Sequence, residues 1–180
     1  KKIQMSTRSG DFIPLMELLD EVGKDAARFF YVSRSNDQHL NFDLALAKAK
    51  NNDNPVYYIQ YAHARIHKVF QELSLNDFNF DKNSGISNLG LLSTNHETEI
   101  VTKLGDYPNV IELSADNYSV HSLANYLLEV AQLFHSYYNA HRFLVADNEI
   151  RNARLALIAA VAIVIKDGLS LLGVSAPEQM

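Results

Sequence analysis

The chain has 180 residues, a net charge of −5 and no cysteine. Disulfides and thiolate metal sites are therefore excluded, and the negative charge argues against a protein that coats nucleic acid over its whole surface. With 47% hydrophobic and 21% charged residues, the composition is typical of a soluble globular domain with a single core.

The first ten residues, KKIQMSTRSG, are basic and start with Lys rather than Met. No apolar signal region follows them. We therefore expect further sequence upstream, and we predict an extended stretch over residues 1–13.

From residue 14 onward, most apolar residues recur with a period near 3.6, which predicts helices. Proline and glycine mark several of the expected ends. The predicted helices cover 14–23, 24–35, 43–51, a segment that begins at Pro55, 94–105, 108–117, 119–145 and 148–167, with a short terminal element over 169–174.

Three features qualify this pattern. Asp25 is the expected N-cap of the second helix, and Gly168 is the expected end of the helix over 148–167. Residues 75–93 are rich in Asn, Asp, Ser and Gly and lack a clear period, so we predict a long, mobile or variable loop there.

No segment alternates with period 2, so the predicted fold class is an all-α helical bundle. The longest apolar run, LALIAAVAIVI over 155–165, is shorter than the roughly 20 residues that a membrane-spanning helix needs. It therefore predicts a buried helix.

The helix that begins at Pro55 has two distinct stripes at helical spacing. One is apolar and suits a core, with Val56, Ile59, Ala62, Ile66, Val69, Phe70 and Leu73. The other lies roughly 130° away at about 100° per residue, and carries Tyr58, Tyr61, Arg65 and Lys68. Tyrosine rings beside a guanidinium can stack on unpaired bases while the cation holds a phosphate or a base edge. From periodicity alone, a second packing interface is the more common explanation of such a stripe.

A second aromatic segment, FHSYYNAHRFL, covers 134–144. Phe134, Tyr137, Tyr138 and Phe143 lie close together in one predicted helix, and aromatic residues in this arrangement are more often core than binding surface.

Catalytic and metal-binding patterns are scarce. His63 and His67 are one helical turn apart, but a zinc site needs three or four converging ligands, so no metal site is predicted. Nucleophile elbows and phosphate-binding glycine loops are absent from the sequence. The loop MSTRSG over 5–10 offers hydroxyls and Arg8 that could stabilise a phosphate, or it is an exposed linker.

Several stretches together resemble bacterial-type arginyl-tRNA synthetases, which are class I aminoacyl-tRNA synthetases. The likeness covers almost the whole chain and is broken mainly at 75–93. Its most specific parts are a Tyr-x-Gln-Tyr-Ala-His-x-Arg pattern and a Ser-Ala-Pro-Glu-x-Met ending, which occur together and in the right order. The stretches that resemble the family are QMSTRSGDF (4–12), EVGKDAARFF (21–30), NFDLALAK (41–48), NPVYYIQYAHARI (54–66), LANYLLEVAQLFHSYYNAHR (123–142) and ARLALIAAVAIVIKDGLSLLGVSAPEQM (153–180).

The resemblance implies two parts. Residues 14–180 would form the helical anticodon-binding domain named after the Asp-Ala-Leu-Arg signature, here DAAR over 25–28 with Ala27 in place of Leu. Residues 1–13 would end the catalytic domain and carry a degenerate form of the Lys-Met-Ser-Lys-Ser loop. The candidate catalytic residues in that loop are Met5, Ser6, Thr7, Arg8 and Ser9.

The resemblance also implies an anticodon site. In the family, residues that match Tyr58, Tyr61, Arg65 and Met180 line the anticodon pocket. The turn before the helix matches a loop that also approaches the anticodon, with Asn51, Asn52, Asp53 and Asn54.

The function implied is anticodon recognition within an enzyme that attaches L-arginine to tRNA(Arg) through arginyl-adenylate, using ATP and Mg²⁺. The nucleotide-binding fold would lie upstream, so this chain alone should be inactive and bind no cofactor. We expect a cytoplasmic monomer with no membrane or DNA partner. The alternative is a helical protein-interaction module that docks a partner helix on the tyrosine stripe and binds no RNA.

Overall fold

The computed structural model describes residues 14–35, 37–39, 41–75 and 77–180, and within these ranges it contains helices and no strand. The predicted all-α fold is thereby confirmed. The helices are α1 (Leu15–Val22), α2 (Lys24–Val32), α3 (Leu44–Lys48), α4 (Pro55–Leu75), α5 (Lys82–Ser87), the 3₁₀ turn η1 (Leu89–Leu91), α6 (Asn95–Gly105), α7 (Tyr107–Asp116), α8 (Val120–Ala140) and α9 (Asn148–Leu171).

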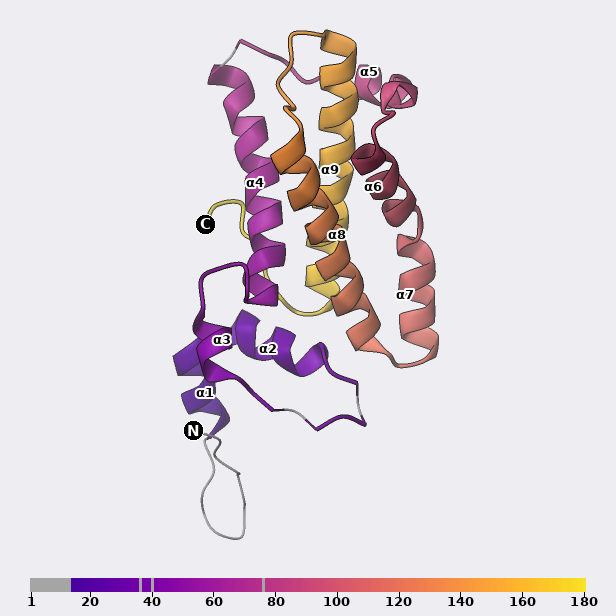
Figure 1. Ribbon diagram of the computed structural model, residues 1–180. Helices are drawn as coiled ribbons and strands as arrows, with labels where there is room; N and C mark the ends of the chain where they lie inside the picture. Colours follow the sequence, from indigo (N-terminus) through magenta and orange to yellow (C-terminus); the bar gives the residue numbers. More distant parts are fainter. Residues whose placement is uncertain (1–13, 36, 40, 76) are drawn as a thin grey trace.

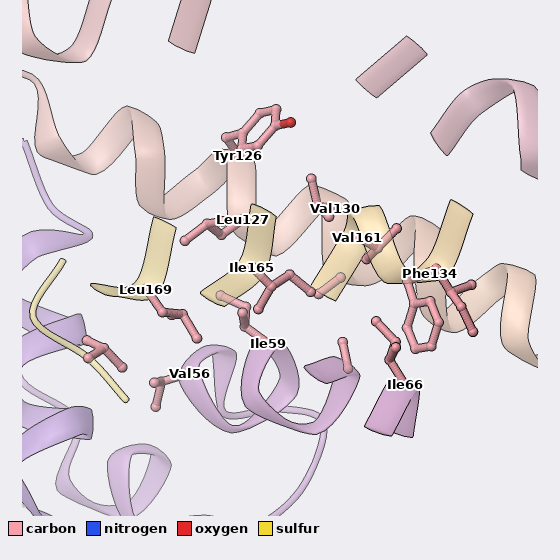
Figure 2. Close-up of a cluster of buried hydrophobic side chains, with 14 of the residues drawn as sticks. Val56, Ile59, Ile66, Tyr126, Leu127, Val130, Phe134, Val161, Ile165 and Leu169 are labelled. Carbon is pink, nitrogen blue, oxygen red and sulfur yellow. The ribbon is translucent and has the colours of Figure 1, made fainter. Parts of the chain in front are cut away.

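The three longest helices, α4, α8 and α9, lie side by side and enclose the core (Figure 1). Helices α1, α2 and α3 gather at one end of this group, while α6 and α7 flank its far side from α4. The apolar stripe predicted on α4 is confirmed, because Ile59 and Ile66 are fully buried. Figure 2 shows them facing Val161 and Ile165 of α9 and Phe134 of α8.

The apolar run over 155–165 lies within α9, and most of its large side chains are buried. Its prediction as a buried helix is therefore confirmed. Among the described helices, none combines the length and mean hydropathy that crossing a bilayer requires.

A buried carboxylate joins three of the helices on the side away from α4. Glu97 of α6 accepts hydrogen bonds from Tyr137 Oη of α8 at 2.8 Å and from Arg154 Nε of α9 at 3.0 Å. It also forms a capping box with Thr94 at the start of α6. Burial alone would raise the pKa of Glu97, but the bonds from Thr94 and Tyr137 and the charge of Arg154 outweigh it and lower the pKa. The carboxylate is therefore stabilised in its ionised form and fixes α6 against α8 and α9.

The long loop predicted over 75–93 is wrong, since α5 and η1 lie within it. Asp81 caps α5 by accepting bonds from the backbone of Asn83 and Ser84. Gly85 then lies against α9 so closely that a Cβ atom there would be 2.5 Å from the carbonyl oxygen of Asn152. The helix is short and depends on this close approach, so the segment has no amphipathic period that a sequence pattern could detect.

Several predicted boundaries also differ. Asp25 does not cap α2: Gly23 occupies the cap position without a side-chain bond, and Asp25 lies inside the first turn. Gly168 does not end α9, which continues to Leu171. A Cβ atom at Gly168 would come within 2.6 Å of Leu127 Cδ2, so this glycine permits close packing of α8 on α9. Helix α8 ends at Ala140 instead of 145, and α3 covers only Leu44–Lys48, with Asp43 as its N-cap.

Candidate functional site

The turn that precedes α4 is fixed by one inward-facing side chain. Asn54 is buried, and its Nδ2 donates to the carbonyl oxygens of Ala47 at 3.1 Å and Ala49 at 2.9 Å. The other three residues predicted to form the anticodon-proximal turn, Asn51, Asn52 and Asp53, are exposed. Of the four, these three are available to a ligand, while Asn54 holds the loop in shape.

Arg65 is held from several sides by groups of α4 and α8. Its Cζ lies 4.4 Å from the ring centroid of Tyr61 and 4.7 Å from that of Tyr138. Its Nη1 lies 3.2 Å from Nδ1 of His135. Cation–π contacts of this kind restrain a guanidinium, and its five N–H donors lie in one plane.

His135 connects Arg65 to the backbone of α4. A guanidinium can only donate, so Nδ1 of His135 accepts from Arg65, and Nε2 carries the proton that it donates to the Tyr58 carbonyl oxygen at 3.1 Å. Burial lowers the pKa of His135; the bond to Tyr58 opposes this shift, and the charge of Arg65 adds to it. The ring is therefore neutral near pH 7 and acts as a fixed acceptor for Arg65.

The tyrosines of α4 continue this arrangement. The ring of Tyr58 lies 4.3 Å from that of His135, and burial raises the Tyr58 pKa although the charge of Arg65 opposes the shift. The rings of Tyr57 and Tyr61 are stacked with centroids 6.1 Å apart. We call the six residues Tyr57, Tyr58, Tyr61, Arg65, His135 and Tyr138 the tyrosine–arginine cluster.

The structure thus brings together three of the predicted anticodon residues, Tyr58, Tyr61 and Arg65. It adds Tyr57, His135 and Tyr138, none of which was predicted to belong to the site. Tyr57 lies four residues before Tyr61 and therefore shares a helix face with it, so the spacing contained the signal for Tyr57, but the predicted stripe was not extended to it. The FHSYY segment contained the signal for His135 and Tyr138, which are three residues apart and therefore share one face of α8.

The core assignment for the aromatic segment of α8 holds for most of its members. Phe134, Tyr137 and Phe143 are buried. Tyr138 is only half-buried. Its ring packs against the rings of Phe134 and Phe143 and also contacts the guanidinium of Arg65. It therefore belongs both to the edge of the core and to the cluster.

Met180, the fourth predicted pocket residue, lies at the end of a tail that is anchored on another face of α4. The tail is bound by Gln60 and His63, which lie roughly 160° around the helix from the mean direction of Tyr58, Tyr61 and Arg65. The Met180 side chain is 52% exposed. The candidate catalytic residues Met5, Ser6, Thr7, Arg8 and Ser9 lie outside the described residues.

The cluster has the size and chemistry to hold a short single-stranded segment. From Tyr57 to Arg65, α4 rises about 12 Å at about 1.5 Å per residue, which is comparable to three bases at a spacing of about 3.4 Å. The four tyrosine rings are half-buried, so each is held by neighbours while part of its surface remains open, whereas the His135 ring beneath them is buried. Arg65 supplies fixed donors among these rings, which suits a base edge or a phosphate.

Comparison with known proteins places this helical arrangement in a defined class. The family model described as the DALR anticodon binding domain matches residues 59–180, which include most of α4 and all of α8 and α9. The chain belongs to the DALR anticodon-binding domain family.

Its relatives point to a particular enzyme within that class. The chain is 59% identical over its full length to the arginine–tRNA ligase of Coxiella burnetii and covers 30% of that protein. It is 56% identical to the arginine–tRNA ligase of Thioalkalivibrio sulfidiphilus, again over its full length and 31% of the relative. The solved structure of Thermus thermophilus arginyl-tRNA synthetase superposes with a TM-score of 0.72 at 27% identity, over 97% of this chain and 29% of that one. The chain thus spans about a third of the length of these relatives.

Proposed function

We propose that this chain is the anticodon-reading domain of an arginine–tRNA ligase. The parent enzyme attaches L-arginine to tRNA(Arg) through arginyl-adenylate, with ATP and Mg²⁺, and acts in the cytoplasm as a monomer. The single observation that carries the proposal is the tyrosine–arginine cluster on α4 and α8, in a chain whose family is an anticodon-binding domain. The chemistry of aminoacylation belongs to the rest of the parent enzyme, and this chain alone is inactive.

Every arginine codon has G as its middle base, so every arginine anticodon has C there. A cytosine out of its stack offers a ring nitrogen and a carbonyl as acceptors and an amine as donor. Arg65 donates to the acceptors, and Tyr58 and Tyr61 provide surfaces on which the unstacked bases rest. Met180 contributes an apolar contact at the edge of the pocket, and Asn51, Asn52 and Asp53 contact the neighbouring nucleotides.

Residues 1–13 have a separate role in this proposal. Met5, Ser6, Thr7, Arg8 and Ser9 close over ATP in the parent enzyme, and the hydroxyls together with Arg8 stabilise negative charge on the reacting phosphate. This role does not depend on the cluster and requires the catalytic domain.

The test is binding of the chain to stem–loop RNAs that differ only in the middle anticodon base. We expect the cytosine form to bind best, and we expect affinity to fall steeply with salt because phosphates are neutralised. Tyr61→Ala and Arg65→Ala should weaken binding roughly tenfold, which corresponds to about 1.4 kcal/mol, and should reduce the preference for cytosine.

Lys68→Ala is the matched control for Arg65→Ala. Lys68 is exposed on the same helix, so its loss should weaken all the RNAs equally and leave the preference for cytosine unchanged. If the chain binds none of these RNAs but retains a protein partner with little salt dependence, the cluster is a docking face and the proposal is wrong.

A further inference from the structure

The C-terminal tail has no regular secondary structure, yet side chains of α2 and α4 hold its backbone at three points. Arg28 Nε donates to the carbonyl oxygen of Leu172, and Gln60 Nε2 donates to that of Ser175, both at 2.9 Å. Nδ1 of His63 donates to the Pro177 carbonyl oxygen, also at 2.9 Å. Each bond is made to the backbone, so together they fix the path of the tail regardless of its side chains.

Asp25 strengthens this arrangement from α2. Its Oδ2 accepts from Gln60 Nε2 at 3.0 Å and also from the hydroxyl of Ser175. It therefore orients Gln60 and binds the tail directly. Asp25 and Arg28 are the two charged residues of the DAAR segment, while Ala26 and Ala27 between them are buried in the protein. The charged pair and the alanines thus serve different faces of α2.

The start of the tail is packed into the protein. Leu172 and Val174 are buried, and Gly173 turns the chain with a φ of 71°. A Cβ atom at Gly173 would lie 3.3 Å from Arg28 Nε, so the backbone passes directly against the guanidinium. Beyond the last anchor, the chain end lies next to α4 (Figure 1).

The anchors of the tail and the tyrosines of the cluster lie on two sides of α4, roughly 160° apart around the helix, with the outer side of the helix between them. Ala64 lies between Gln60 and Tyr61 on the helix surface and is only 6% exposed. The helix surface between the side of the tail and the side of the tyrosines is therefore covered at Ala64, while one turn earlier Tyr57 and Gln60 line a surface hollow. A tail that is already ordered there avoids the loss of conformational freedom that a free tail would undergo on binding a ligand.

We infer that Asp25, Arg28, Gln60 and His63 are positioning residues for RNA binding, which hold residues 172–178 on α4 so that the chain end forms a fixed edge of the RNA-binding surface. This inference rests on the proposed function and assigns a task to both charged residues of the DAAR segment. They act on RNA through the tail and without touching it.

The experiment compares RNA affinity and tail order in the same variants. Asp25→Asn removes the carboxylate, and Ser175→Ala removes the same contact from the side of the tail, with less risk to folding. Arg28→Met removes the bond to Leu172, and Arg34→Met, at an exposed arginine just beyond α2, is its matched control. Amide exchange over 175–179 and the NMR signal of the Met180 methyl group report tail order, and circular dichroism confirms the fold.

We expect Asp25→Asn, Ser175→Ala and Arg28→Met to speed exchange in the tail and to weaken binding of an arginine-anticodon stem–loop about fivefold, or about 1 kcal/mol. A chain that ends at Val174 should lose about as much affinity. Adding Asp25→Asn to that shortened chain should cause no further loss, because the residue acts through the tail. Arg34→Met should change neither quantity.

An equal loss from Asp25→Asn in the full and the shortened chain would overturn the inference, as would unchanged tail exchange and affinity in all three variants. If the unaltered chain binds no stem–loop RNA, the proposed function has failed and the role in RNA binding fails with it. Amide exchange then still decides separately whether these residues order the tail.

Discussion

Arg65 Nη1 donates to Nδ1 of His135 at 3.2 Å, and this bond determines which nitrogen of the imidazole carries the proton. The opposite nitrogen donates to the carbonyl oxygen of Tyr58. A single buried ring therefore links the cation of the tyrosine–arginine cluster to the backbone of the helix that presents it. Such a ring limits the motion of Arg65 before any ligand arrives, which favours binding.

His135→Phe tests this link, because phenylalanine keeps a ring beside Tyr58 but removes both hydrogen bonds. We expect the free energy of unfolding to fall by about 1–2 kcal/mol for the lost bonds, and RNA affinity to fall about fivefold as Arg65 loses its fixed position. Urea unfolding and fluorescence anisotropy with a stem–loop RNA measure the two effects. His121→Phe, at the other end of α8, is the control and should leave affinity unchanged. Full affinity in the His135 variant would show that Arg65 needs no such support.

Acidification should act on the same histidine. Burial lowers the pKa of His135 and also that of His63 in the folded chain, whereas in the unfolded chain each has a pKa of about 6.5. As pH falls below about 6.5 the unfolded state takes up protons first, so folding stability decreases until the lower folded pKa values are reached.

Urea unfolding on either side of this range measures the effect. Above about pH 7 the contribution of the two histidines should be constant. The His135→Phe variant should show a smaller decrease on acidification than the unaltered chain. An identical decrease in both proteins would mean that His135 does not titrate with folding.

Gly85→Ala tests the docking of α5 on α9. Alanine normally stabilises a helix relative to glycine by up to about 1 kcal/mol. Here the added carbon would lie 2.5 Å from the Asn152 carbonyl oxygen and 2.9 Å from Ala156 Cβ, so a backbone must move. We expect a net loss of about 1–3 kcal/mol in the free energy of unfolding.

Gly105→Ala is the control, since a Cβ there meets no atom within 4 Å, and it should be neutral or stabilising. Thermal unfolding of both variants decides, and a stabilised Gly85→Ala would mean that α5 does not pack as described.

The sequence predicted the long helices well because their apolar residues face one continuous core over many turns. Ile59 and Ile66 on α4, for example, recur at helical spacing and are both fully buried. Helix α5 was missed for the opposite reason: it is only six residues long and packs through Gly85, which has no side chain for a pattern to register. Gly168 misled the prediction of the end of α9, because a glycine that admits Leu127 looks the same in sequence as one that ends a helix.

The candidate site was likewise predictable only in part. Tyr58, Tyr61 and Arg65 share one face of α4 and can be found from spacing alone. Their contact with His135 and Tyr138 depends on how α8 packs beside α4, and a single sequence does not specify the packing of two helices that are 70 residues apart in the chain. The role of Asp25 was misread because its partners, Gln60 and Ser175, are also distant in sequence.

Tyr57 provides the sharpest test of where the RNA-binding surface ends. Its ring stacks on Tyr61 at the margin of the predicted stripe, and it lines a surface hollow of about 550 Å³ that Lys24, Lys48 and Lys50 also line. If a base extends the stack from Tyr61 onto Tyr57, Tyr57→Ala should weaken RNA binding by about 1–3 kcal/mol. Tyr57→Phe should retain most of the affinity, because stacking needs the ring and not the hydroxyl.

The control for this last variant is Tyr118→Ala. Tyr118 is 82% exposed in the turn between α7 and α8, so it offers RNA a more accessible ring than Tyr57 does but lies away from the tyrosine–arginine cluster. Its loss should leave stem–loop affinity unchanged in the same anisotropy titration. If Tyr118→Ala weakens binding as much as Tyr57→Ala, exposed rings bind RNA without regard to position. If neither variant has an effect, the surface ends at Tyr61 and the adjoining hollow takes no part in binding.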